Sequence, residues 1–168
     1  MTQPLRRTML TAAALTAVLL TGCTNPFPGI HFTPEKTTTP TGQTNTPYPA
    51  DLTHLDDILT LGKTTLPEGA TDITITPATK FAEGSPGAWG YVIAYHADPQ
   101  PIRNHIDTYT SYPSEGIDHY PDSDSYIYIK DIDFTDIQHP LILGFDKTQL
   151  VIERPLGRCW LLIRGAPR

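Results

Sequence analysis

The stretch Trp89-Gly90-Tyr91-Val92-Ile93-Ala94-Tyr95-His96 is apolar at nearly every position. A strand with one solvated face alternates apolar and polar residues, whereas a strand that is buried on both faces does not. We therefore predict that residues 89–96 form a central strand of a sheet.

The segments on either side of this strand predict two helices and a first strand. Residues 71–76 alternate as a strand with one wet face. After the central strand, Asp98 and Pro99 suit the start of a helix, whose apolar stripe is Ile102, Ile106 and Tyr109, and Pro113 closes it. Before residue 71, Asp51 can cap a short helix that Gly62 ends. The apolar stripe of that short helix is Leu52, Leu55, Ile58 and Leu59.

The second half of the domain predicts further strands separated by turns. The expected strands are 126–130, 141–145, 150–154 and 158–164, and the expected turns between the last three are 146–149 and 155–157. Sequential hairpins imply an antiparallel sheet. We therefore expect an α+β fold in which one main helix packs on one face of an antiparallel sheet.

The first 22 residues are expected to be a signal peptide. Arg6 and Arg7 precede a run from Met9 to Leu20 that holds only apolar residues and threonines. Twelve helical residues span ~18 Å, which is too short for a hydrocarbon core of ~30 Å. Cleavage of the ordinary type before Cys23 would place bulky Leu20 where a small residue is needed. The arginine pair also fits a loose twin-arginine pattern, so both export routes remain open.

The four residues Leu20-Thr21-Gly22-Cys23 resemble the lipobox of bacterial lipoproteins. The resemblance implies that the Cys23 thiol carries a diacylglyceryl group and that cleavage leaves Cys23 as the first residue. Acyl chains such as palmitate would then anchor the protein to the membrane. We therefore expect a lipid-anchored protein on the extracytoplasmic side of the cell membrane, with the membrane as a partner through diacylglyceryl-Cys23.

A linker is expected between this cysteine and the folded domain. Fourteen of the 27 residues from Thr24 to Ala50 are Thr or Pro, which favours an extended, solvated chain that could reach on the order of 80 Å. The density of Thr and Pro also suits O-glycosylation. The expected organisation is a signal peptide over 1–22, a lipidated and disordered linker over 23–50, and one domain over 51–168. Within that domain, the turn Leu66-Pro67-Glu68-Gly69-Ala70 is similar to one in small uncharacterised lipoproteins of actinobacteria, a resemblance that transfers no functional residue.

Charge argues against a nucleic-acid partner. The chain has 12 Lys and Arg against 18 Asp and Glu, and two of the arginines lie in the leader. The remainder therefore carries a net charge of −8, whereas nucleic-acid binding needs a basic face. Residues 98–146 are strongly acidic and residues 147–168 are basic. The two segments either complement each other within the fold or leave an acidic face for a cation or a basic partner.

The familiar catalytic and cofactor motifs are missing from the sequence. No serine lies in a Gly-x-Ser-x-Gly or Ser-x-x-Lys motif, no two histidines have His-x-x-x-His spacing, and no glycine loop suits a phosphate. We expect no cofactor. Cys159 shares a strand face with Leu161 and Ile163, which predicts a buried thiol and not a nucleophile. His105 lies beside the apolar stripe of its helix and is expected to be a hydrogen-bonded boundary residue.

The region from Tyr109 to Asp136 is rich in tyrosine and aspartate, and it supplies the candidate site residues. Asp122, Asp124 and Asp133 have part of the spacing of a calcium loop, but Ile127 replaces the glycine that an EF-hand needs. Tyr120, Tyr126 and Tyr128 are candidates for stacking on a sugar ring. The alternative is that these tyrosines only pack the sheet and that the acids only keep the loop soluble.

The sequence therefore favours a binding function over a catalytic one. We expect a non-enzymatic module at the cell surface, whose partner would be cell-wall glycan, another envelope protein or a small ligand. The alternative is a small envelope hydrolase that uses Asp or Glu carboxylates. Two convergent carboxylates with perturbed pKa values would favour the hydrolase.

Overall fold

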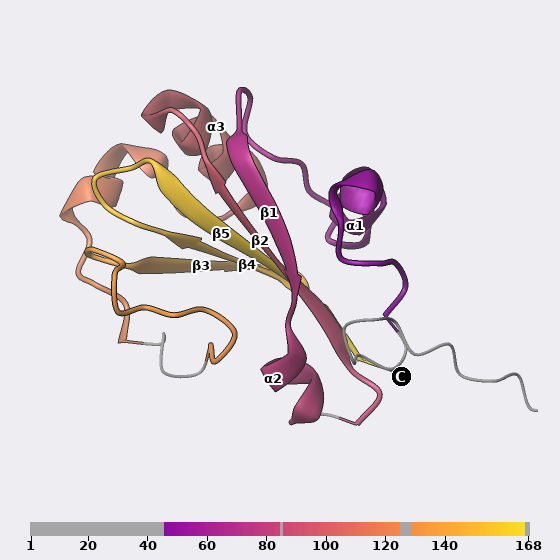
Figure 1. Cartoon of the computed structure of the whole chain (residues 1–168). Coiled ribbons are helices and arrows are strands. Elements are labelled where there is room, and N and C mark those ends of the chain that lie inside the picture. Colours follow the sequence, from indigo (N-terminus) through magenta and orange to yellow (C-terminus); the bar gives the residue numbers. More distant parts are fainter. Residues whose placement is uncertain (1–45, 85, 125–128, 167–168) are drawn as a thin grey trace, which may run out of the picture. The chain divides into compact units, whose positions relative to one another are not determined.

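A computed structural model describes residues 46–84, 86–124 and 129–166, which all belong to one compact unit, Glu35–Arg168. The elements in chain order are η1 (Leu52–His54), α1 (Leu55–Leu61), β1 (Thr71–Pro77), α2 (Thr79–Glu83), β2 (Trp89–His96), α3 (Pro99–Tyr109), η2 (Ser114–His119), β3 (Leu141–Phe145), β4 (Thr148–Ile152) and β5 (Arg158–Gly165) (Figure 1). None of the helices in the described part of the chain has the length and apolar character needed to span a membrane.

The five strands form one antiparallel sheet in the order β1-β2-β5-β4-β3. β2 and β5 pair along their whole length, from Trp89 opposite Gly165 to His96 opposite Arg158. The predicted strand 89–96 is therefore an inner strand, as its apolar sequence indicated, and the predicted α+β class is confirmed. β5, from the end of the chain, occupies the middle of the sheet (Figure 1).

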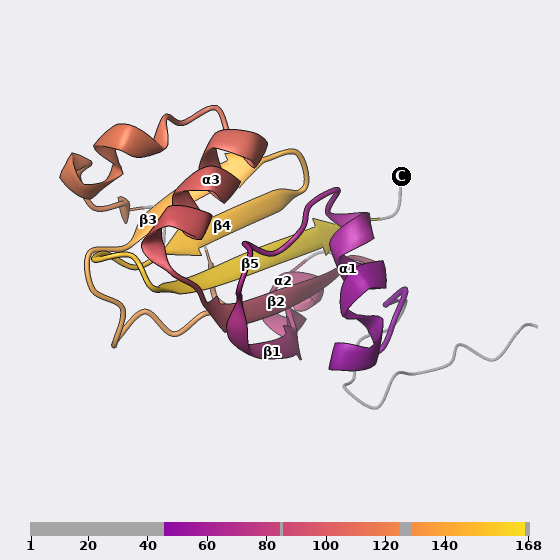
Figure 2. The same cartoon turned by 90° about the horizontal axis from the view of Figure 1, so that it is seen from above.

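One face of the sheet packs against α3, α1 and η2. Figure 2 looks onto this face, where α3 and α1 lie over the strands and α2 lies behind them. Ile102 and Ile106 of α3 and Ile58 of α1 are fully buried there. They meet alternate residues of the inner strands, among them Tyr91, Ile93, Tyr95, Cys159, Leu161 and Ile163. The expectation of one main helix packed on one face is confirmed.

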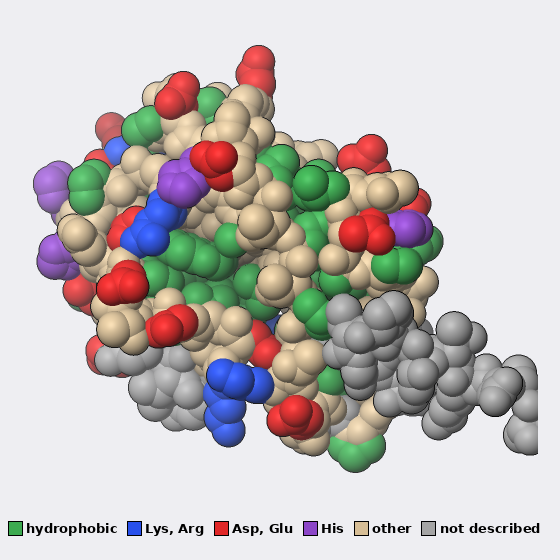
Figure 3. Space-filling model, viewed as in Figure 1, with side chains coloured by type: hydrophobic (Ala, Val, Ile, Leu, Met, Phe, Trp, Pro, Cys, Tyr) green, Lys and Arg blue, Asp and Glu red, His purple; other side chains and the backbone are tan. Residues whose placement is uncertain are grey.

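The opposite face packs against shorter elements. Val92, Val151 and Leu162 point to this side and contact Ala78 beside α2 and three isoleucines of the segment 129–137. The side chains that complete this second core are only partly buried: Phe81, Phe134, Ile142 and Trp160. Hydrophobic side chains are visible at this surface, between Lys or Arg side chains and acidic ones (Figure 3). The second core is therefore smaller and less covered than the first.

The first helix agrees with the sequence in its cap and in Ile58 and Leu59, which are buried, but Leu52 of the predicted apolar stripe lies in η1 and is exposed. Asp51 accepts a hydrogen bond from the His54 backbone N–H, at 3.2 Å, and Gly62 follows the last turn of α1. A glycine that ends a helix usually adopts the left-handed conformation, but Gly62 has a φ of −82°. The left-handed residue is instead Lys63, with a φ of 52°. A Cβ at position 62 would lie 2.9 Å from the Ile163 Cδ1. A larger residue at position 62 would therefore require the Ile163 side chain to shift, because the helix end lies directly on β5.

The later elements differ from the sequence prediction in their bounds. The turn between β3 and β4 contains only Asp146 and Lys147, so β4 begins at Thr148 and not at 150, and it ends at Ile152. Asp98 precedes α3 but its side chain makes no capping bond, and α3 ends at Tyr109, before Pro113. α2 and η2 were not predicted. In the predicted strand 126–130, residues 126–128 lie outside the described residues, and Ile129 and Lys130 are not in a strand.

Cys159 is buried in the first core, as its position on β5 predicted. Burial raises the pKa of the Cys159 thiol to about 12. A thiol with such a pKa remains protonated at neutral pH, and thiolate is the nucleophilic form. The residue therefore acts as a small hydrophobic side chain.

His105 lies deeper than the sequence suggested. Its side chain is buried in α3, where its ring contacts Tyr109 with centroids 4.7 Å apart and lies 6.4 Å from Phe145. The Nε2 atom is buried and has no hydrogen-bond partner among the described residues, so the expectation of a hydrogen-bonded boundary residue was wrong. Burial lowers the pKa of His105 from 6.5 to about 4.

We predict that His105 makes the stability of the domain depend on pH. The folded-state pKa is below that of the unfolded chain, so the unfolded chain binds more protons between about pH 6.5 and pH 4. The free energy of unfolding should therefore fall across this interval as the pH is lowered, by up to about 3 kcal/mol. His105→Phe keeps the ring but removes the titration, and urea unfolding from pH 7 to pH 4.5 should show a smaller decrease in this variant.

The control for this prediction is His119→Gln, which removes an exposed histidine of η2. Equal flattening of the pH dependence in both variants would contradict the assignment to His105.

Candidate functional site

The buried Arg154 side chain organises the irregular part of the domain. It follows β4, and its guanidinium lies beneath the segment from η2 to Asp122. Nε donates to the His139 carbonyl at 2.8 Å, and Nη1 donates to the carbonyls of Ile117, at 3.2 Å, and Tyr120. Nη2 donates to Asp122 Oδ1 at 2.6 Å. One arginine thus fixes residues 117–122 and His139 against the end of β4.

A second arginine holds the adjoining segment. Arg158 at the start of β5 forms a two-point ion pair with Glu153, with N–O distances of 2.5 and 2.7 Å, and also donates to the Asp136 carbonyl. Glu153 in turn accepts from the Gln138 backbone N–H at 2.8 Å. The Arg158 partner lowers the pKa of Glu153, which keeps the carboxylate charged. Residues 136–138 are therefore held by polar contacts to β5 and its preceding turn.

These two anchored segments border two adjoining hollows that share Asp122 and His139. The larger has a volume of about 700 Å³ and the smaller of about 370 Å³. We call them together the acidic hollow. It is lined by Asp118, Tyr120, Asp122, Asp124, Phe134, Thr135, Ile137, Gln138, His139, Pro140, Arg154 and Pro155. Carboxylates, an amide, a hydroxyl and aromatic rings thus meet in one open recess.

The structure brings together only some of the residues that the sequence singled out. Tyr120, Asp122 and Asp124 line the acidic hollow. Asp133 does not line it, because its carboxylate accepts from the backbone N–H and the hydroxyl of Thr135, at 3.0 and 2.6 Å. The candidates Tyr126 and Tyr128 and the lipidation candidate Cys23 lie outside the described residues.

The three aspartates proposed for calcium do not assemble into a cation site in the described ranges. Asp122 is bound to Arg154 and lies 3.2 Å from the His139 Nδ1, and Asp133 is bound to Thr135. Within residues 46–84, 86–124 and 129–166, no three His, Cys, Asp or Glu side chains are grouped so that they could hold a metal ion. The described carboxylates therefore offer no argument for bound calcium.

Several carboxylates of the irregular region have arginine or hydroxyl neighbours. Asp118 pairs with Arg103 and Asp122 with Arg154. Hydrogen bonds from Ser114 lower the pKa of Asp107, and those from Thr135 lower the pKa of Asp133. A glycoside hydrolase needs one carboxyl that stays protonated until it donates. The lowered pKa values of Asp107 and Asp133 are the opposite of what that role requires.

No local pattern indicated that Arg154, Gln138 and His139 would line a site. Arg154 was expected to end a strand, and His139 was only one of six histidines. A proline-flanked stretch such as Gln138-His139-Pro140 signals a loop, but no local pattern shows which distant loop it approaches. The feature that marks the site is the burial of the Arg154 side chain, and that burial depends on the whole fold.

Comparisons of the chain with models of protein families, with curated proteins and with solved structures found no match. The chemistry of the described residues therefore carries the functional argument.

We predict that removing the Arg154 guanidinium destabilises the domain. Arg154→Met keeps much of the side-chain length but leaves Asp122 and three carbonyl oxygens without their donor. Hydrogen bonds to charged groups and buried ion pairs contribute several kcal/mol when one partner is deleted, so a loss on the order of 3 kcal/mol is expected. Urea unfolding followed by circular dichroism measures it.

Lys63→Met is the matched control, because Lys63 forms a long, exposed pair with Asp146 at 3.7 Å. Exposed pairs of this kind add little stability. If both variants unfolded at the same urea concentration as the parent protein, Arg154 would not be the anchor of this region.

Proposed function

We propose that the protein is a membrane-anchored envelope lipoprotein whose folded domain binds a polar, hydroxyl-rich ligand such as cell-wall glycan, without catalysing a reaction. The observation that carries the binding role is the acidic hollow, an open recess in which fixed hydrogen-bonding groups lie beside aromatic side chains. Ligand sites typically combine an apolar lining with a few placed polar groups.

The groups in the acidic hollow suit sugar hydroxyls. Charged carboxylates such as Asp122 and Asp124 accept hydrogen bonds, and the Gln138 amide can both donate and accept. The flat rings of Tyr120 and Phe134 offer apolar area against which the face of a sugar can pack. Arg154 fixes Asp122 and the neighbouring backbone. These groups would therefore lose little conformational freedom when a ligand binds, which lowers the entropic cost of binding.

The same contacts favour binding over hydrolysis. Asp118 and Asp122 are each already paired with an arginine side chain. A hydrolase would need a proton donor among these groups. The proposal of a small envelope hydrolase is therefore weaker than the proposal of a binding module.

Anchoring at the membrane rests on the leader and on Cys23. Two acyl chains on one cysteine give stable attachment, since each buried CH₂ contributes ~0.8 kcal/mol. The Thr- and Pro-rich segment 24–50 would hold the domain away from the bilayer. A binding module on such a tether could reach the wall while remaining attached to the cell.

We predict that Cys23→Ala releases the protein from the membrane fraction. The variant lacks the thiol that would carry the diacylglyceryl group, so fractionation of cells should recover it in the soluble envelope fraction. Mass spectrometry of the mature N-terminal peptide of the parent protein should show the lipid. Cys159→Ala is the control and should stay with the membrane. An unmodified Cys23 in the membrane-bound parent protein would refute the anchor.

We predict that Asp124→Asn weakens binding of soluble fragments of cell-wall glycan about tenfold. The substitution removes a charged acceptor at the hollow while keeping the shape of the side chain, and a charge-assisted hydrogen bond contributes about 1.5–3 kcal/mol. Isothermal titration calorimetry measures the change. Asp56→Asn, in an exposed position of α1, should bind like the parent protein. Equal affinities for all three proteins, or no binding by any, would argue against the acidic hollow as the site.

A further inference from the structure

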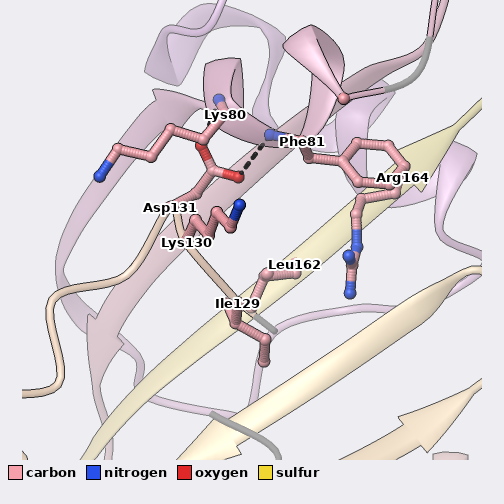
Figure 4. A pocket seen from close by; sticks show the side chains of 8 residues that line it. Lys80, Phe81, Ile129, Lys130, Asp131, Leu162 and Arg164 are labelled. Atoms are coloured by element: carbon pink, nitrogen blue, oxygen red, sulfur yellow. Dashed lines mark hydrogen bonds between the residues drawn. The ribbon is translucent and has the colours of Figure 1, made fainter. Parts of the chain in front are cut away.

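A second, smaller hollow is lined by the start of the segment 129–137 and has the opposite charge. It has a volume of about 170 Å³ and lies between α2, the end of β5 and residues 129–131 (Figure 4). Leu162, Ile129 and Phe81 supply apolar walls, and Lys80, Lys130 and Arg164 supply three cations. We call it the basic hollow. It shares no lining residue with the acidic hollow.

Arg164 is the most informative of these cations. It is half-buried, and its guanidinium lies 4.9 Å from the centre of the Phe81 ring. No carboxylate among the described residues lies within ion-pair distance of it. Burial lowers the pKa of Arg164, because taking a charge from water is unfavourable, and the nearby charge of Asp131 offsets this cost only in part. A bound anion would relieve that cost.

The one carboxylate in the basic hollow is already engaged. Asp131 accepts hydrogen bonds from the backbone N–H groups of Lys80 and Phe81, at 2.8 and 3.0 Å, and so caps α2 (Figure 4). Both of its oxygens face α2 in these bonds. The Lys130 side chain extends toward the space between Asp131 and Arg164, whereas the Lys80 ammonium points away (Figure 4). Lys130 and Arg164 are therefore the two cations that a ligand would meet.

We infer that the basic hollow binds a phosphate group, with Arg164 and Lys130 as its ligands and the apolar walls contacting the carbon part of the molecule. A guanidinium donates two parallel N–H bonds to an oxyanion, and an ammonium adds a compact charge. Together they match the three terminal oxygens and the double charge of a phosphate monoester better than the two oxygens of a carboxylate. Leu162, Ile129 and Phe81 leave room for an apolar substituent next to it.

This site does not depend on the proposed glycan function, since it uses different residues and the opposite charge. The phosphate could belong to a free monoester or to a lipid headgroup, and the two sources are separable by experiment. Hexyl phosphate represents the first, and vesicles containing phosphatidylglycerol represent the second.

The test uses the full-length Cys23→Ala variant, which lacks the proposed lipid anchor and so cannot insert acyl chains into vesicles. Calorimetric titration with hexyl phosphate, inorganic phosphate and hexyl sulfate is combined with a flotation assay on phosphatidylglycerol or phosphatidylcholine vesicles. We expect saturable binding of hexyl phosphate, at least tenfold tighter than inorganic phosphate. Lys130→Gln and Arg164→Gln should each weaken it at least tenfold, and Lys63→Gln, an exposed cation elsewhere, should leave it unchanged. Lys130 is exposed, so its variant tests the site even if Arg164→Gln unfolds, which circular dichroism would reveal.

Each outcome decides the proposal. Flotation that requires phosphatidylglycerol and is lost in Lys130→Gln, without hexyl phosphate binding, assigns the site to a lipid headgroup and supports the phosphate assignment. Equal affinity for hexyl sulfate and hexyl phosphate overturns the preference for phosphate, and equal affinity for inorganic and hexyl phosphate overturns the role of the apolar walls. No binding in any assay, or binding unchanged in Lys130→Gln, overturns the site.

Discussion

The fold depends on burying both faces of the β2–β5 pair. Each of these strands has apolar side chains on both sides, with Tyr91 and Ile163 turned to one core and Val92 and Leu162 to the other. A sheet of this kind is stable only if other elements remove both faces from water. α3, α1 and η2 cover one face, and α2 with residues 129–137 covers the other. Each hollow described above lies where these covering elements meet the sheet or one another.

Arginines from residues 147–168 bind the segments that cover the sheet. Arg154 binds the segment that ends at Asp122, and Arg158 binds the Asp136 carbonyl. The acidic segment 98–146 and the basic segment 147–168 therefore complement each other in part, one of the two alternatives that the charge pattern left open. The complementarity is incomplete, because several acids remain at the acidic hollow while Arg164, near the end of β5, has no carboxylate partner among the described residues.

The two hollows would give one small domain two separate kinds of recognition. Carboxylates and aromatic rings line the first, and a guanidinium, an ammonium and apolar side chains line the second. For a domain held near a membrane, a phosphate-binding hollow would add a second attachment to a surface rich in phosphate esters.

Local patterns in the sequence determined most of the fold of this protein. The apolar run at 89–96 predicted an inner strand, the stripe from Ile102 to Tyr109 predicted the main helix, and alternation at 158–164 predicted that Cys159 is buried. These features depend on periodicity within a few residues. Tertiary structure alone decided that Arg154 reaches Tyr120 and Asp122, that the His105 Nε2 is buried with no hydrogen-bond partner among the described residues, and that Lys130 and Arg164 line one hollow. Such contacts join residues that lie dozens of positions apart, and their energies depend on burial, which no local pattern records.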